Sequence, residues 1–186
     1  MTEVDHTFWY LTRAAGLLAY LLLFASVALG LTLTGGQFER QLGRFRVYDL
    51  HRFIALLALA VTVFHMLIVL PDRYFSFSLL ELLLPFASPY EPLYMALGGL
   101  SFYLTALLIG SFYARRLLSY PVWRLLHYLT FGAFALALVH AIGAGTDTAA
   151  DWVLYLYVAT ALVATNLLIY RALKGSARGL RAAEES

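Results

Sequence analysis

Apolar residues are grouped along the chain into five long runs, and short polar segments separate these runs. The runs cover about residues 8–33, 46–70, 93–113, 121–142 and 152–170. Each is close to the roughly 20 residues that a helix needs to cross the hydrocarbon core of a bilayer. The sequence shows none of the strict alternation that is typical of membrane β-barrel strands. The pattern therefore predicts an all-α integral membrane protein, a bundle of five transmembrane helices.

Charged residues in the connecting segments alternate in sign. Basic residues follow the first, third and fifth runs, and they are Arg40, Arg44, Arg46, Arg52, Arg115, Arg116, Arg124, Arg171, Lys174, Arg178 and Arg181. The other two connections are acidic on balance, with Asp72, Glu81, Glu91, Asp147 and Asp151 against Arg73. Because basic connections stay on the cytoplasmic side of a membrane, we expect the N-terminus outside and the C-terminus in the cytoplasm. This is a multi-pass topology in an inner or plasma membrane.

The outer connection between the second and third runs contains a shorter apolar stretch, "SFSLLELLLPF". Ser78 precedes Glu81 by three residues, which is the spacing of a capping box at the start of a helix. The stretch is too short to span a bilayer. We therefore expect a short helix at the outer interface, either as a plain connector or as a lid over a site on the outer side.

Composition narrows the class of protein further. The chain is 62% hydrophobic and 13% charged, whereas soluble domains carry about a quarter charged residues. The basic residues do not form the concentrated face that nucleic acid requires, so no nucleic-acid partner is expected. The absence of cysteine from the sequence excludes thiolate-bound zinc, iron–sulfur clusters and disulfides. The N-terminus lacks the basic start of a cleaved signal peptide. No linker divides the chain, so we expect residues 1–186 to form a single domain.

Two of the runs carry a histidine near each end. His51 and His65 flank the second run, and His127 and His140 flank the fourth. The two runs cross in the same direction, so His51 and His127 share an inner level while His65 and His140 share an outer level roughly 20 Å away. Two neutral imidazoles from facing helices are what a six-coordinate haem iron needs. The pattern predicts two haem groups, bound without covalent attachment because no cysteine is present.

A single histidine in a membrane helix often has a purely structural role, as an interfacial or hydrogen-bonded residue. Four paired histidines at depth are costly, however, and indicate function. The main alternative is a haem-free membrane subunit, or a transporter of transition-metal ions or protons, that uses the same histidines. Such a path would need histidine or acidic residues at intermediate depth, and the two runs have none there. This favours fixed cofactors.

The spacing within the fourth run raises a geometric problem. His51 and His65 are 14 residues apart, which comes within about 40° of whole helical turns. His127 and His140 are 13 residues apart, which misses whole turns by about 140° in a straight helix. The fourth helix must therefore bend or overwind, and Gly132, midway between its histidines, is the expected place.

With these features the chain resembles the ferric reductase-like transmembrane domain. Ferric reductases, NADPH oxidases and the haem subunit of a bacterial periplasmic methionine sulfoxide reductase share this domain. The resemblance rests on the two histidine pairs with their spacings, on "TRAAG" in the first run and on "PVWRLLHYLT" leading into the fourth. It covers nearly the whole chain and implies two b-type haems that pass electrons through the membrane. Many relatives have a sixth span that is absent here.

Three arginines are candidates for holding haem propionates, which are anions that guanidinium groups bind well. Arg13 lies at the outer level, and the resemblance implies that it serves the haems; the alternative is that it snorkels to the surface. Arg52 and Arg124 lie near the inner histidines. They serve the inner haem or anchor the helices at the interface.

The expected function is electron transfer across the membrane, as a component of a membrane oxidoreductase. The donor would be a cytoplasmic flavoprotein or a membrane quinol, and the outer acceptor would be ferric iron, oxygen or a partner reductase. The oxidases in the family continue into a flavin and nicotinamide domain. This chain ends about fifteen residues after its last run and has no G-x-G-x-x-G motif, so we expect no bound FAD or NAD(P) and a separate donor.

Overall fold

The computed structural model describes residues 6–35, 43–72 and 77–184, with side chains described to residue 175. The elements in chain order are α1 (Thr7–Gly35), α3 (Arg44–Ile68), α4 (Leu79–Leu83), α5 (Pro92–Tyr113), α6 (Tyr120–His127), α7 (Leu129–Ala144), the 3₁₀ helix η1 (Thr146–Ala149) and α8 (Asp151–Glu184). The described residues contain no strand, so the all-α prediction is confirmed. Arg40 and Arg73 lie outside the described residues, as do the side chains of Arg178 and Arg181.

Five helical segments among the described residues are long and apolar enough to cross a membrane, with α6 and α7 together forming the fourth. The boundaries agree with the sequence pattern because each polar connection ends a helix. Pro92 and Pro121 stand in the first turns of α5 and α6, where the missing N–H group removes no hydrogen bond. The last helix continues to Glu184, well beyond the apolar run that ends near Tyr170.

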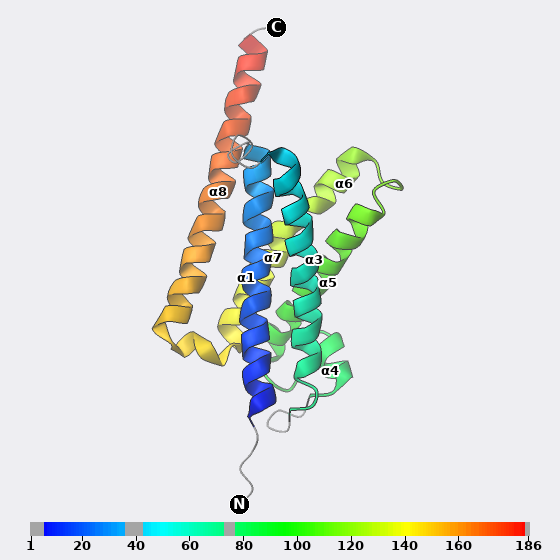
Figure 1. The fold of residues 1–186 in the computed structure, drawn as a ribbon, viewed down its shortest axis with the longest axis vertical. Helices are drawn as coiled ribbons and strands as arrows, with labels where there is room; N and C mark the ends of the chain where they lie inside the picture. Colours follow the sequence, from blue (N-terminus) through cyan, green and yellow to red (C-terminus); the bar gives the residue numbers. More distant parts are fainter. Residues whose placement is uncertain (1–5, 36–42, 73–76, 185–186) are drawn as a thin grey trace, which may run out of the picture.

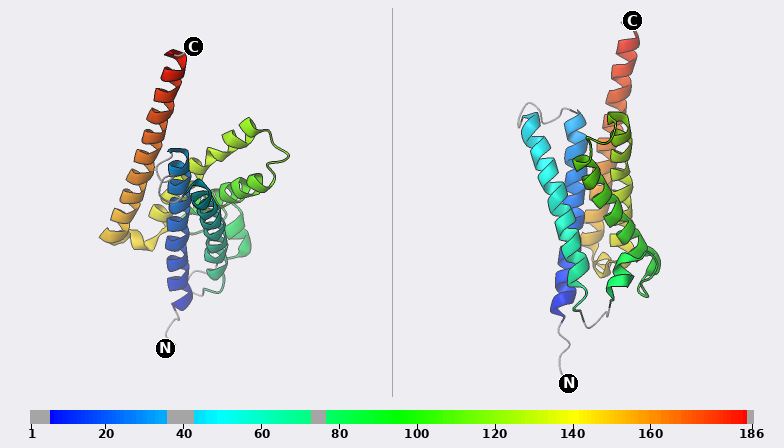
Figure 2. Two further views of the ribbon diagram at one scale, coloured as in Figure 1. Left: turned by 45° about the horizontal axis from the view of Figure 1, so that its top comes forward. Right: turned by 90° about the vertical axis from the view of Figure 1, so that its right-hand side faces the viewer.

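Helix α1 lies at the centre of the bundle, where it packs against α3, α7 and α8 (Figures 1 and 2). Helix α5 packs mainly against α7. A buried core between α1, α7 and α8 consists of Tyr20, Val27, Leu31, Phe134, Val153, Tyr157 and Ala164. Large apolar side chains such as Phe53, Leu107 and Leu162 remain exposed on the outer faces, which is typical of a surface that contacts lipid.

The short helix predicted in the second connection is present as α4. The Ser78 hydroxyl accepts a hydrogen bond from the Glu81 N–H at 3.3 Å, and the Glu81 carboxylate accepts one from the Ser78 N–H at 2.6 Å. These bonds form the expected capping box. The Ser78 N–H and the Ser78 hydroxyl both donate to the Glu81 carboxylate, which holds the pKa of Glu81 below its usual value. The Tyr103 hydroxyl donates to the carbonyl of Leu83 and so ties α4 to α5.

The fourth span is irregular at Tyr128, and the expected irregularity at Gly132 was wrong. The Thr130 hydroxyl donates to the His127 carbonyl at 2.6 Å, and the Phe131 N–H bonds the Tyr128 carbonyl at 3.2 Å. Because the threonine side chain occupies a backbone acceptor, the chain tightens locally to 3₁₀-type bonding. A 3₁₀ turn rotates the chain further per residue than an α-turn, in the direction that the 13-residue histidine spacing requires. Figure 1 shows α6 and α7 as two successive segments with different tilts.

Candidate functional site

The four histidines meet in two pairs, each formed across two helices. The ring centroids of His51 and His127 are 6.4 Å apart, and their planes are inclined at 78°. The ring centroids of His65 and His140 are 6.5 Å apart, with an inclination of 74°. The structure thus brings together the same rings that were paired by depth from the sequence.

Three of the four rings bond the backbone of a neighbouring helix through Nδ1. The Nδ1 atoms of His51, His65 and His140 lie 2.9, 2.9 and 2.8 Å from the carbonyl oxygens of Ser26, Thr12 and Tyr94. A carbonyl oxygen can only accept, so each Nδ1 carries the hydrogen and each Nε2 keeps its lone pair. A lone pair on Nε2, with Nδ1–H bonded to a carbonyl, is the arrangement that metal-binding histidines usually have.

The spacing of the rings fits one metal ion within each pair. Two imidazole nitrogens that bind a first-row metal on opposite sides, at roughly 2.0–2.1 Å each, place the ring centroids roughly 6 Å apart. The observed spacings of 6.4 and 6.5 Å agree with this value. Among the described residues, no three or more histidine, aspartate or glutamate side chains gather in a metal-binding group. Each pair therefore offers two facing imidazoles as the only candidate metal ligands at its level among the described residues.

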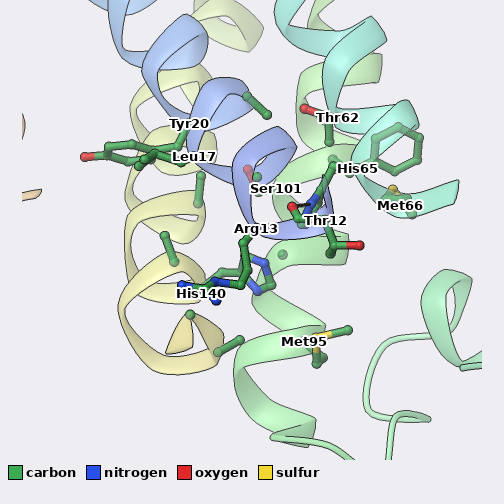
Figure 3. A pocket seen from close by; sticks show the side chains of 18 of the residues that line it. Thr12, Arg13, Leu17, Tyr20, Thr62, His65, Met66, Met95, Ser101 and His140 are labelled. Carbon is green, nitrogen blue, oxygen red and sulfur yellow. Dashed lines mark hydrogen bonds between the residues drawn. The ribbon is translucent and has the colours of Figure 1, made fainter. Parts of the chain in front are cut away.

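A cavity of about 200 Å³ lies at the outer level, and both His65 and His140 line it. Figure 3 shows the two rings reaching this space from α3 and α7. Other labelled residues that line the cavity are Thr12, Arg13, Leu17, Tyr20, Thr62, Met66, Met95 and Ser101. The Thr12 hydroxyl is buried there without a hydrogen-bond partner. Buried polar atoms of this kind require an explanation such as a bound group.

Arg13 lines the same cavity but is already paired. Its Nε donates to one carboxylate oxygen of Asp147 at 2.8 Å, and its Nη2 donates to the other. The guanidinium also lies 5.6 Å from the centroid of the Tyr10 ring. The bidentate pair ties Arg13 to the outer connection after α7, with the arginine side chain 32% exposed. From the sequence, Asp147 was interpreted only as a loop charge, because 134 residues separate it from Arg13 and no local pattern connects them.

The inner level has two buried donors without acceptors. The Arg52 guanidinium lies 5.0 Å from the Phe112 ring centroid, and its Nε is buried with no hydrogen bond. The Trp123 ring stacks on His127 at 5.1 Å with an inclination of 21°, and its Nε1 is likewise buried and unbonded. Trp123 was missed from the sequence, although its position one turn before His127 on α6 was a usable signal. Arg124 is exposed on α6, and both of its predicted roles, at the inner haem and as a helix anchor, stay predictions.

The comparisons with known proteins yield one family. A family model described as a domain of unknown function (DUF8596) matches residues 7–147. This segment contains all four paired histidines. No curated protein matches the chain significantly, and no solved structure does so either.

Proposed function

We propose that this chain, which belongs to the DUF8596 family of unknown function, passes electrons across a membrane through two haem b groups. His51 and His127 would hold the inner haem, and His65 and His140 the outer one. The observation that supports this most strongly is the occurrence of two ring pairs with metal-compatible spacings of 6.4 and 6.5 Å on the same two spans. When bound, the haems supply reversible one-electron carriers.

The residues of the chain have two kinds of role in this proposal. Each histidine pair would hold one haem with two protein ligands, which would favour electron transfer over chemistry on a substrate at the metal. The buried donors Trp123 Nε1 and Arg52 Nε, which lack acceptors, are suited to the acidic propionate groups of the inner haem. Arg13 would have the same role at the outer level and would share its charge with Asp147.

The proposed setting is a membrane with the N-terminus outside and the C-terminus in the cytoplasm. Five apolar helices support insertion, and the alternating charge of the connections supports this orientation. The exposed apolar side chains would then contact lipid. With this orientation the His51 level faces the cytoplasm and the His65 level faces the outside.

The donor in this proposal is a separate cytoplasmic flavoprotein or a membrane quinol. The acceptor on the outer side is ferric iron, oxygen or a partner reductase. These choices rest on the resemblance to the ferric reductase-like domain, because a fold with two haems does not select a substrate by itself.

Haem content tests the proposal. We expect the protein, when it is expressed with ample haem and purified in detergent, to contain about two haem b per chain in a pyridine haemochrome assay. The dithionite-reduced protein should show the absorption bands of six-coordinate haem b. A protein that is folded and monodisperse but binds no haem would contradict the proposal and favour a haem-free role for the histidines.

A further inference from the structure

Each of the three rings that bond a carbonyl also lies against a glycine. A Cβ atom added to Gly98 would lie 2.6 Å from Nδ1 of His140, and one added to Gly16 would lie 2.9 Å from Cε1 of His65. At Gly30 the corresponding distance to Cε1 of His51 is 3.4 Å. Any side chain at the first two positions would overlap an imidazole, and one at the third would press on it.

The glycines stand in a fixed relation to the carbonyls. Gly16, Gly30 and Gly98 follow the acceptor residues Thr12, Ser26 and Tyr94 by four positions each. A helical side chain points back toward the N-terminus and covers the turn before its own Cα. A side chain at each of these positions would therefore cover the carbonyl that the histidine uses. A glycine leaves that carbonyl open to a second donor.

His127 lacks this arrangement. In the described part of the chain its ring has no hydrogen-bond partner, and no glycine lies beneath it. The ring is held instead by stacking on Trp123, at 5.1 Å between centroids. Stacking restrains the plane of the ring but does not select which nitrogen carries the hydrogen.

We infer that Gly16, Gly30 and Gly98 are positioning residues that fix three imidazoles for metal binding, and that His127 is the exchangeable ligand. This inference rests on the proposed haem function. In the outer pair, both rings are held by a hydrogen bond to a carbonyl, whereas in the inner pair only the ring of His51 is held in this way. A hydrogen bond from Nδ1 makes Nε2 a stronger and better-oriented ligand. The inner site should therefore open first to a small ligand from solution.

The outer pair is held further by a reciprocal contact between α5 and α7. A Cβ atom at Gly143 on α7 would overlap the ring of Tyr94 on α5, while the carbonyl of the same tyrosine accepts the bond from His140. The tyrosine ring thus packs into α7 and the histidine ring packs into α5. This contact keeps His140 and Gly98 in register.

The first test uses the haem-free protein, so its result does not depend on cofactor binding. Nitrogen-15 NMR of histidine-labelled protein in detergent reports which ring nitrogen carries the hydrogen. We expect His51, His65 and His140 in the Nδ1–H form and His127 in a mixture of forms, with each signal assigned by a single histidine variant. A dominant Nε2–H form at His65 or His140 would overturn the inference.

The second test uses carbon monoxide as the probe on the reduced, haem-loaded protein. Carbon monoxide should replace the bond from His127 with an iron–carbon bond, without a change in electron count, and should bind one haem of the two. In Gly98→Ala the binding should extend to both haems. Gly16→Ala should have a smaller effect in the same direction. Gly30→Ala, with the mildest contact, should fold normally and should only increase ligand binding at the inner haem.

Two glycines serve as matched controls, because a Cβ atom added at Gly110 on α5 or at Gly132 on α7 meets nothing within 4 Å. Gly110→Ala and Gly132→Ala should leave carbon monoxide binding unchanged, since alanine favours a helix more than glycine does. Equal effects of Gly98→Ala and Gly110→Ala would overturn the inference. So would carbon monoxide binding at the outer haem alone, or at neither haem, in the unaltered protein. A folded protein without haem would instead contradict the proposed function and leave the NMR result to decide the positioning role.

Discussion

The angle between the paired imidazole planes has a spectroscopic consequence at the scale of single residues. The planes are inclined at 78° for His51 and His127 and at 74° for His65 and His140. Axial rings that are nearly perpendicular interact with different iron d orbitals and leave these orbitals almost equal in energy. We therefore expect strongly anisotropic low-spin EPR signals from the oxidised, haem-loaded protein. A weakly anisotropic signal of the kind given by parallel rings would contradict the observed ring geometry.

Substitutions of the two members of the Arg13–Asp147 ion pair should shift the redox potential at the outer level in opposite directions. If the outer haem is bound as proposed, removal of a positive charge near it disfavours its reduced form, so Arg13→Gln should lower the outer potential by an amount on the order of tens of millivolts. Asp147→Asn should raise it, because the arginine charge is then no longer offset. Redox titration followed by absorption measures both shifts. Arg116→Gln, which removes the same charge at the opposite end of the bundle, should leave the outer potential unchanged.

The sequence predicts those site residues that recur at a similar spacing along the chain. The two histidine pairs have such a spacing, and their rings lie together as expected. Gly16 and Gly98 are not among the predicted site residues, although in the structure an imidazole lies over each. Gly16 and Gly30 are 14 residues apart, the same spacing as His51 and His65, and this match was a readable signal. No spacing in the sequence indicates Asp147, because its contact with Arg13 depends on tertiary packing alone.

At the scale of helices, length and hydropathy were sufficient to locate the spans. Each apolar run is long enough to cross a bilayer, and charged segments bound it on both sides. The positions at which each helix begins and ends are therefore narrowly determined. The break predicted at Gly132 was wrong, because Gly132 lies inside α7 and the interruption lies at Tyr128. The structure shows that a hydroxyl can disturb a helix more than a missing side chain, since Thr130 occupies the His127 carbonyl while Gly132 lies within regular helix.

The break at Tyr128 sets the angle between the two histidines of this span, which an insertion can test. One alanine inserted after Tyr128 rotates α6 relative to α7 by about 100° and moves His127 away from His51. We expect loss of the inner haem and retention of the outer one, measured by haem stoichiometry and redox titration. As a control, one alanine inserted after Leu117, in the turn between α5 and α6, should leave both haems bound. Loss of both haems from a folded Tyr128 insertion would contradict the independence of the two levels.

At the scale of the whole molecule, the described residues form a helical bundle that contains no second folded unit. None of the connections described between its helices is long enough for a dinucleotide-binding domain. We therefore predict that the purified protein in nanodiscs is not reduced by NADH or NADPH under anaerobic conditions. Addition of a flavin reductase or a quinol should produce reduction, and the effective addition identifies the donor class. Rapid reduction by the nicotinamide alone would show that a donor site lies within these 186 residues.

The histidines lie at two levels. The sequence pattern predicts this arrangement, the fold contains it, and the proposed function depends on it. Helices α3 and α6–α7 each contribute one ring to each level, and the levels are separated by roughly 20 Å along the helices. Electrons that cross the membrane would use both levels in turn. Loss of the haem at one level should therefore stop electron transfer across the membrane, even when the haem at the other level remains bound.

The most direct measurement of this claim is haem stoichiometry across single and paired histidine variants. His51→Ala, His127→Ala and the double variant should each retain about one haem per chain, the same outer haem. His65→Ala, His140→Ala and their double variant should retain the same inner haem. The crossed double variant of His51 and His65 should retain none, although these residues lie on the same helix. If the double variant of His51 and His127 lost both haems while the crossed variant retained one, the pairing across helices would be contradicted.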